Sequence, residues 1–144
     1  MIVAQILRSK PDMGVVSVKP GDSVSSAVAL LSEKRIGTVV VSADGKKLDG
    51  ILSERDIVRE LGRRGAQCLS APVSEMMTTK LTTCTIGHSA DTVLEMMTEG
   101  RFRHLPVMDD GKMIGLISIG DVVKARLMEL SMEKDALEGM IMGH

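Results

Sequence analysis

The 144-residue sequence predicts an α/β protein built from two similar units in tandem. The first observation behind this prediction is the motif G-x-x-S-x-x-D, which occurs at Gly50–Asp56 and again at Gly115–Asp121. The second is that residues upstream of each copy match at a spacing of 66 residues, so that Ser23 aligns with Ser89. A fixed spacing of this kind is typical of a duplicated supersecondary unit. We therefore expect each unit to contain a lead-in helical turn, a strand, a helix, two strands and a closing helix.

The start of each unit is predicted from short apolar segments. Helical turns are expected at Val3–Leu7 and Val73–Met77, ahead of short strands at Val15–Val18 and Leu81–Thr85. The connection between turn and strand is longer in the first unit and contains Pro11, which predicts a loop there.

The middle of each unit has clear helix and hairpin signals. Apolar residues recur at helical spacing within Ser23–Lys34, and Ser23 and its equivalent Ser89 are expected N-caps. The β-branched run Gly37–Ser42 predicts a strand, and the dipeptide Asp44–Gly45 predicts the turn that follows it. A second strand is expected at Leu48–Leu52. After this turn the spacing of the repeat is 65, because the first turn has one residue more.

The closing helices differ in length. The first is expected to begin after Ser53 and to end near Gly62 or Gly65, whereas the second, after Ser118, meets no glycine between Gly120 and Gly139. These signals give the predicted organisation of the chain. The first repeat is expected at 1–65, a linker at 66–72, the second repeat at 73–126, and a C-terminal helical tail at 127–144.

The last helix contains an apolar stripe with two interpretations. Its members alternate at spacings of four and three: Val123, Leu127, Leu130, Lys134, Leu137 and Ile141. The same period suits a helix that packs on its own unit and a helix that forms a dimer contact. Methionines that adapt easily to a partner surface occur nearby, at Met128, Met132, Met140 and Met142.

Composition limits the classes of function. Lys and Arg number 18 against 19 Asp and Glu, a net charge of −1, so a nucleic-acid partner is not expected. No apolar run reaches membrane-spanning length, and Met1–Leu7 does not resemble a signal peptide. We therefore expect a cytoplasmic protein without a membrane partner, in which Cys68 and Cys84 are reduced thiols.

Catalytic and metal-binding motifs are not found in the sequence. Neither G-x-S-x-G nor a phosphate-binding P-loop occurs, and the two motif serines have no evident base. The spacing of Cys84, His88 and His104 fits no established metal site. The sequence therefore predicts neither an enzyme, nor a catalytic cofactor, nor a metal site.

The repeated S-x-x-D has a structural and a functional interpretation. A serine followed three residues later by an acid can form a capping box at a helix start. Asp is shorter than the usual Glu or Gln, however, and is expected to reach back less well. A helix N-terminus also favours an anion, and a carboxylate beside it can bind the hydroxyls of a ribose. Arg101, Arg103 and His104 would add cationic donors, so phosphate and ribose together indicate a nucleotide.

The chain resembles a tandem pair of CBS domains, a Bateman module, over residues 3 to 126. The resemblance rests on G-I-L-S-E-R-D-I and G-L-I-S-I-G-D-V at the last strand–helix junctions, and on R-H-L-P-V on a preceding strand. It implies two repeats packed about a pseudo-two-fold axis, with clefts that bind AMP, ADP, ATP, NAD or S-adenosylmethionine. The leading hypothesis is a non-catalytic regulatory module in which the ligand shifts the two halves or a dimer contact, and an effector protein responds to that shift. The dimer contact of the last helix would make the chain a homodimer.

The resemblance further implies which residues contact the ligand. Asp56 and Asp121 would bind ribose hydroxyls, and Ser53 and Ser118 phosphate or ribose oxygens. Main-chain groups of the two short strands would meet the adenine edge, and the basic residues would face the phosphates. The predicted site consists of Val16, Ser17, Val18, Ser53, Arg55, Asp56, Thr82, Thr83, Cys84, Arg103, His104, Pro106, Ser118 and Asp121.

The two copies differ where the basic residues lie. The first has Gly37-Thr38-Val39-Val40 in place of Arg103-His104-Leu105-Pro106, and the second has Gly120 in place of Arg55. Two equivalent clefts are therefore not expected. The alternative to a nucleotide sensor is a structural or oligomerisation module with vestigial sites, which acts through its dimer surface.

Overall fold

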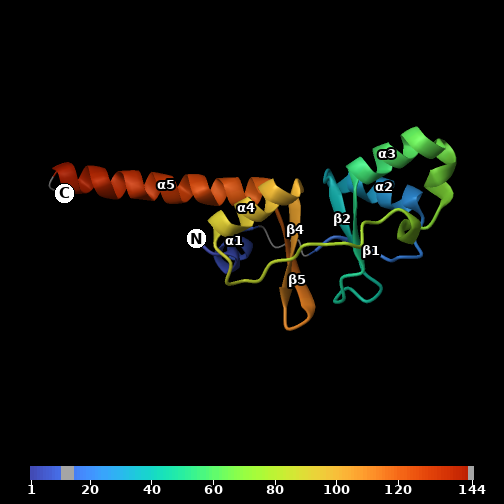
Figure 1. Ribbon diagram of the computed structural model, residues 1–144, viewed down its shortest axis with the longest axis horizontal. Coiled ribbons are helices and arrows are strands. Elements are labelled where there is room, and N and C mark those ends of the chain that lie inside the picture. The colour runs from blue at the N-terminus through green and yellow to red at the C-terminus, as the bar shows by residue number, and fades with distance from the viewer. Residues whose placement is uncertain (11–14, 143–144) are drawn as a thin grey trace. The chain divides into compact units, whose positions relative to one another are not determined.

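The computed structural model describes residues 1–10 and 15–142 (Figure 1). Its helices are α1 (Val3–Ser9), α2 (Val24–Lys34), α3 (Glu54–Arg64), α4 (Ala90–Gly100) and α5 (Ile119–Met142), with 3-10 turns at Ala66–Ser70 and Val73–Glu75. Its strands are β1 (Ser17–Val18), β2 (Thr38–Val41), β3 (Gly50–Ser53), β4 (His104–Asp109) and β5 (Lys112–Ser118). This is the mixed α/β fold that the sequence predicts.

The chain forms two compact units that exchange their lead-in segments. Residues 13–82 and 109–114 form one, here called the α2/α3 unit, and residues 1–12, 83–108 and 115–144 form the other, the α1/α5 unit. These units are not the two sequence repeats, which we predicted at 1–65 and 73–126. Those repeat boundaries stay a prediction. In space, the first lead-in helix belongs with the second set of strands.

The α2/α3 unit has a three-stranded sheet in the order β1-β2-β3. β1 is parallel to β2, with Ser17 opposite Val40, and β2 is antiparallel to β3, with Thr38 opposite Ser53. All four residues of β2 are buried, as expected for the central strand. The core also includes Val24, Ala27 and Leu31 of α2, Leu52 of β3 and Ile57 of α3.

The α1/α5 unit contains most of β4 and β5, while the tip of this hairpin, residues 109–114, belongs to the α2/α3 unit. The turn residues Asp110 and Gly111 have φ angles of 51° and 75°, the positive values that a two-residue hairpin turn requires. The buried core of the α1/α5 unit is Val3, Ile6, Cys84, Ala90, Val93, Met97, Leu105, Val107, Ile117, Val122 and Ala125. Val3 and Ile6 come from α1, so the first helix completes a core that is otherwise made late in the sequence.

The motif glycines make room for the lead-in segments. A Cβ added to Gly50 would lie 2.7 Å from Sδ of Met77 and 2.9 Å from the backbone oxygen of Thr78. A Cβ added to Gly115 would lie 2.8 Å from Cδ2 of Leu7. Each closing strand therefore needs glycine where a lead-in segment crosses it.

The second short strand is weaker than predicted. Within Leu81–Thr85 the structure has only an isolated bridge between Cys84 and Val107. In the α2/α3 unit, the backbone N–H of Val40 donates to the carbonyl of Val16 at 3.1 Å and so holds the equivalent short strand. The equivalent of Val40 in the α1/α5 unit is Pro106, which has no N–H and cannot make this bond.

The remaining differences are local. The second lead-in is a 3-10 turn at Val73–Glu75, and the predicted linker contains a 3-10 turn at Ala66–Ser70 that buries Cys68. The predicted N-caps are correct, since Ser23 Oγ accepts from Ser26 N–H and Ser89 Oγ from Thr92 N–H, both at 3.1 Å. The predicted loop around Pro11 lies outside the described residues.

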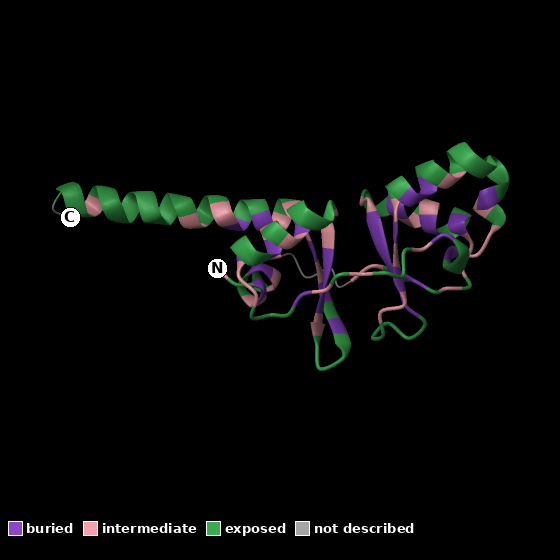
Figure 2. Cartoon of the chain, viewed as in Figure 1, coloured by how far each residue is buried: buried purple, intermediate pink, exposed green. Residues whose placement is uncertain are grey.

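The apolar stripe of α5 does not pack on its own unit. The buried residues of this helix are Val122 and Ala125, which do not belong to the stripe. Leu127 is 62% exposed and Leu137 is 59% exposed. Figure 2 shows the C-terminal half of α5 exposed beyond the rest of its unit. The interpretation that the stripe packs on its own unit is therefore wrong.

Candidate functional site

The start of α5 positions Ser118 and Asp121 against each other. Asp121 Oδ2 accepts the backbone N–H of Ser118 at 2.8 Å, and Ser118 Oγ accepts the backbone N–H of Asp121 at 3.1 Å. The Ile119 N–H is also satisfied, by the Arg103 carbonyl at 2.8 Å. Among residues 1–10 and 15–142, the Gly120 N–H at the first turn of the helix has no acceptor, as is usual for the first N–H groups of a helix.

Lys10 forms an ion pair with Asp121, and we did not predict this contact from the sequence. Its Nζ lies 2.9 Å from Asp121 Oδ2 and donates to the Leu116 carbonyl at 2.8 Å. Asp121 Oδ1 has no hydrogen-bond donor among the described residues. One carboxylate oxygen therefore holds the helix start and Lys10, and the other is available to a ligand hydroxyl.

The surroundings of Asp121 keep its carboxylate ionised. Burial raises the pKa of Asp121, but the Ser118 N–H and the Lys10 ammonium lower it by more, so the net change is downward from 3.8. The Asp121 side chain is 24% exposed. An ionised and partly accessible carboxylate is a suitable acceptor for two adjacent ribose hydroxyls.

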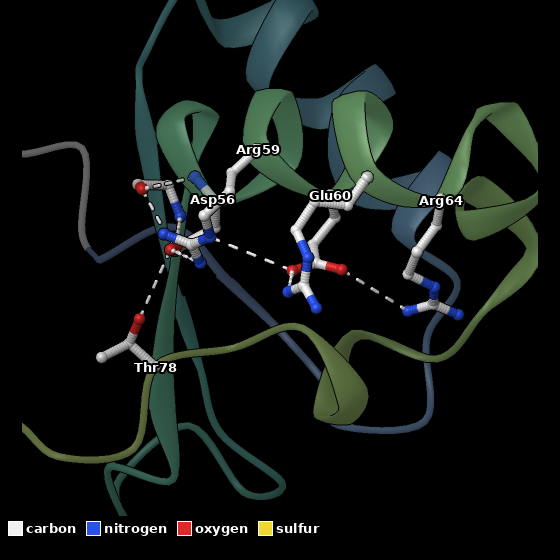
Figure 3. A network of polar contacts seen from close by, with 7 residues as sticks. Asp56, Arg59, Glu60, Arg64 and Thr78 are labelled. Atoms are coloured by element: carbon white, nitrogen blue, oxygen red, sulfur yellow. Dashed lines mark hydrogen bonds and ion pairs between the residues drawn. The ribbon is translucent and has the colours of Figure 1, made fainter.

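The equivalent Asp56 is closed by protein contacts (Figure 3). Its Oδ2 accepts from the backbone N–H and the hydroxyl of Ser53, at 3.0 and 3.1 Å. Its Oδ1 accepts from Arg59 at 3.0 Å and from Thr78 at 3.5 Å. Asp56 is only 6% exposed, so in this conformation it has no accessible oxygen for a ribose.

Both copies form the capping box. The Ser53 pair is reciprocal, because Asp56 N–H also donates to Ser53 Oγ at 3.3 Å. The expectation that Asp would reach back less well than Glu is therefore wrong. The structural role of S-x-x-D holds in both units, and only the second copy has acceptor capacity left over.

The predicted adenine contacts are main-chain groups of Val16 to Val18 and Thr82 to Cys84, and their hydrogen bonds within the fold show which of them a ligand could reach. Along β1 and the residue before it, the Val16 and Val18 carbonyls accept from the N–H groups of Val40 and Ser42, at 3.1 and 2.9 Å. The main chain of Ser17 between them faces the open edge of the sheet. Cys84 donates to Pro106 and accepts from Met108, at 2.9 and 2.8 Å, and its side chain is buried. Ser17 is therefore better placed than Val16 or Val18 to offer main-chain groups to an adenine edge.

The second segment shows the same alternation. Both main-chain groups of Cys84 are engaged within the fold, so contact with the adenine edge through Thr82 to Cys84 stays a prediction that is easier to meet at Thr82 and Thr83. Thr83 is the equivalent of Ser17, and Thr82 keeps a carbonyl that Pro106 cannot bond.

The remaining predicted residues lie around the helix starts. Arg103 is exposed just before β4, and His104, the first residue of β4, is partly buried. Pro106 is buried within β4, so its effect on the site comes from its missing N–H. Arg55 is exposed in the first turn of α3, beside the closed Asp56.

An open cavity of about 510 Å³ lies in the α2/α3 unit. Its lining comes from the end of α2 and the start of α3, including Leu31, Arg35 and Ile57. None of the predicted site residues lines this cavity. It adjoins the first S-x-x-D motif through Glu54, but the lining includes neither Ser53 nor Asp56.

The described part of the chain has neither a metal-ion cluster nor a membrane-spanning helix. Residues 1–10 and 15–142 contain no cluster of three or more His, Cys, Asp or Glu side chains arranged to hold a metal ion. Across the same part of the chain, no helix has the length and apolar character to cross a membrane.

Comparison with known proteins identifies the family. The family model of the CBS domain matches residues 3–63 and 73–128. The mitochondrial CBS domain-containing protein CBSX3 of Arabidopsis thaliana is 37% identical over 126 residues, which is 85% of this chain and 61% of that protein. This chain therefore spans less than two thirds of that relative.

Solved structures agree with this assignment. A CBS-domain containing protein from Agrobacterium tumefaciens is 42% identical with a TM-score of 0.81, over 88% of this chain and 99% of that one. CBSX2, solved in complex with AMP, is 30% identical with a TM-score of 0.74, over 88% and 96% of the two chains. CBSX2 is also a protein of Arabidopsis thaliana. With two matched copies of the domain, the chain belongs to the CBS-domain family as a tandem pair.

Proposed function

We propose that this chain is a non-catalytic regulatory module that binds an adenosine-containing nucleotide at the Ser118–Asp121 site. AMP is the first ligand to test, because the related CBSX2 was solved with AMP. ADP, ATP and NAD share the ribose and phosphate chemistry and are the alternatives. S-adenosylmethionine shares the ribose but carries no phosphate.

The observation that carries this proposal is the unused oxygen of Asp121. Oδ2 is engaged by Ser118 and Lys10, whereas Oδ1 has no donor among the described residues. A ribose offers two neighbouring hydroxyls to such a carboxylate. Ser118 Oγ accepts from Asp121 N–H, and its own hydrogen can be donated to a ligand oxygen.

The phosphate would lie near the N-terminus of α5. The Gly120 N–H there has no acceptor in the described part of the chain, and a helix start favours an anion. Arg103 adds a guanidinium that can bind a phosphate through two hydrogen bonds. Thr83 would meet the adenine through its main chain.

The two sites are proposed to differ in occupancy. Asp56 has both oxygens engaged and is nearly inaccessible, whereas Asp121 is partly exposed. Binding at the first copy would require the contacts from Arg59 and Thr78 to break. We therefore expect one occupied site for each chain.

Isothermal titration calorimetry tests the proposal. The wild-type chain is expected to bind AMP, ATP or NAD with about one site, and Asp121→Asn is expected to lose at least tenfold in affinity. Asp56→Asn is the matched control, because it changes the same motif in the closed copy and should leave binding unchanged. No binding of any of these ligands at millimolar concentration would contradict the proposal, and so would equal effects of the two variants.

The second candidate function is an oligomerisation module with vestigial sites. The observation that favours it is the exposed stripe on α5. A ligand-induced rise in melting temperature that Asp121→Asn removes would count against this candidate. As a sensor, the chain would act through an effector protein, and we propose that it does so in the cytoplasm as a homodimer.

A further inference from the structure

The six stripe residues Val123, Leu127, Leu130, Lys134, Leu137 and Ile141 are here called the α5 stripe, and none of them belongs to the buried core of its unit. Exposure of the apolar members runs from 41% at Val123 to 84% at Ile141. The equivalent helix α3 has 11 residues, ends at Arg64 and is capped by Gly65, whereas α5 has 24 residues. The extra length and its stripe are therefore not part of the duplicated unit.

The α5 stripe and the buried face of α5 point in different directions. Val122 and Ala125 pack into the core of the α1/α5 unit. At about 100° per residue, the stripe is turned by roughly 130° from that face. Exposed apolar surface of this extent marks a binding surface. One face of α5 can thus hold the helix on its unit while another binds a partner.

We propose that the α5 stripe pairs with the α5 stripe of a second copy of this chain, in antiparallel orientation. Its alternating spacing of four and three is the one that lets two helices interlock side chains along a shared seam. A two-fold pair requires each copy to present the same, self-complementary surface. The pattern of charges beside the stripe supplies this self-complementarity.

A parallel pair would place like charges together. Lys134 would face the partner's Lys134 inside the seam. Glu133 would lie beside the partner's Glu138 on both flanks, because these positions meet in a parallel coiled coil. Neighbouring like charges destabilise a helix pair.

An antiparallel pair relieves most of this repulsion. Its layers place Val123 against the partner's Ile141, Leu127 against the partner's Leu137, and Leu130 against the partner's Lys134. Each layer occurs twice. In this register the seam is apolar except for Lys134, whose long side chain can reach the edge.

The flanking charges decide the orientation. In the antiparallel register Lys124 lies beside the partner's Glu138, twice for each pair. Both residues are exposed, and the contact of Glu138 with Lys134 on its own helix is loose, at 3.8 Å. The one unfavourable contact is between Glu133 and the partner's Glu133. In the antiparallel pair, two attractive charge contacts outweigh one repulsive contact. In the parallel pair, the contacts between charged residues are repulsive only.

Sedimentation equilibrium of the full chain without nucleotide tests the surface. We expect a dimer that dissociates on dilution, and Leu137→Glu should leave only monomer. Met132→Glu is the matched control, because Met132 is similarly exposed, at 63%, on the opposite side of the helix. Circular dichroism checks that the variants stay helical. A monomer at all concentrations, or a dimer insensitive to Leu137→Glu, would overturn the proposal.

A charge reversal tests the orientation. Glu138→Lys should weaken the dimer about tenfold, because two attractive contacts become repulsive, and adding Lys124→Glu should restore it. In a parallel pair Glu138→Lys would strengthen the dimer by removing its repulsion from Glu133, and that result would overturn the antiparallel assignment. This proposal does not depend on nucleotide binding, so either proposal can fail without the other.

Discussion

Lys10 and Asp121 form an ion pair of 2.9 Å between the end of the first helix and the start of the last. Lys10 also donates to the carbonyl of Leu116, which is 106 positions away in the sequence. This lysine ties the lead-in segment to the strand–helix junction of its unit. It also sets the charge state of the residue that we propose as the ribose ligand.

The Lys10–Asp121 pair predicts a pH-dependent contribution to stability. The pKa of Asp121 in the folded chain is lowered from 3.8, so its stabilising effect is present above pH 4 and is lost as the pH falls through the folded pKa. Lys10→Met should lower the free energy of unfolding by up to about 1 kcal/mol at pH 7. Urea unfolding at pH 7 and pH 3 checks this, and the difference from wild type should shrink at pH 3. An equal loss at both pH values would contradict the prediction.

Asp56 predicts a larger structural effect than Asp121. Replacing Asp56 with Ala removes a cap and leaves the Ser53 N–H and Thr78 hydroxyl without their acceptor. We expect a loss of about 1–3 kcal/mol in the free energy of unfolding. Asp121→Ala should cost less, because Asp121 is more exposed. Chemical denaturation of both variants makes the comparison, and a greater loss for Asp121→Ala would show that the two environments have been misassigned.

The motif glycines predict a graded pair of variants. Gly50→Ala would place its Cβ 2.9 Å from the Thr78 backbone oxygen, which cannot move without shifting the chain. Gly115→Ala would meet only the tip of the Leu7 side chain, at 2.8 Å. We expect a loss of about 1–3 kcal/mol for Gly50→Ala and a smaller loss for Gly115→Ala. Thermal unfolding measures both, and the reverse order would not fit these contacts.

Cys84 predicts an unreactive thiol. Burial raises its pKa from 9.0 to about 11, so the thiolate that reacts with disulfide reagents is scarce at pH 8. The native chain should therefore react slowly, and both Cys84 and the buried Cys68 should react at once in denaturant. Because the folded pKa of Cys84 is raised, its effect on stability is fully present below pH 9 and is lost as the pH rises toward 11. Rapid native labelling of Cys84 at pH 8 would contradict its burial.

The elements predicted best are those defined by local signals. The helix caps at Ser23 and Ser89 and the strand before Asp44 follow from residues within one turn of each other, and the structure has them where expected. The second short strand was predicted too long. Its hydrogen bonds depend on Pro106, which lies far from it in the sequence.

The site could be predicted only in part, because its two copies share a motif but not an environment. Ser53–Asp56 and Ser118–Asp121 have the same spacing and the same capping contacts. What separates them is the segment after each lead-in, which brings Thr78 to Asp56 and Lys10 to Asp121. The sequence signal for this difference lies in the residues that follow the two lead-ins, after Leu7 and after Met77, which include Lys10 and Thr78. That signal does not show that one carboxylate is closed and the other open.

The position of α1 has a consequence for the order in which the chain folds. Val3 and Ile6 precede by about 80 positions the other members of the core that they fill, which begin at Cys84. At ordinary rates of synthesis, the apolar face of α1 waits on the order of ten seconds for that core to emerge. During this interval residues 15–82 can already collapse together, and α1 must find its place afterwards by closing a long loop. Helix α1 would therefore settle later than the α2/α3 unit, although it precedes that unit in the sequence.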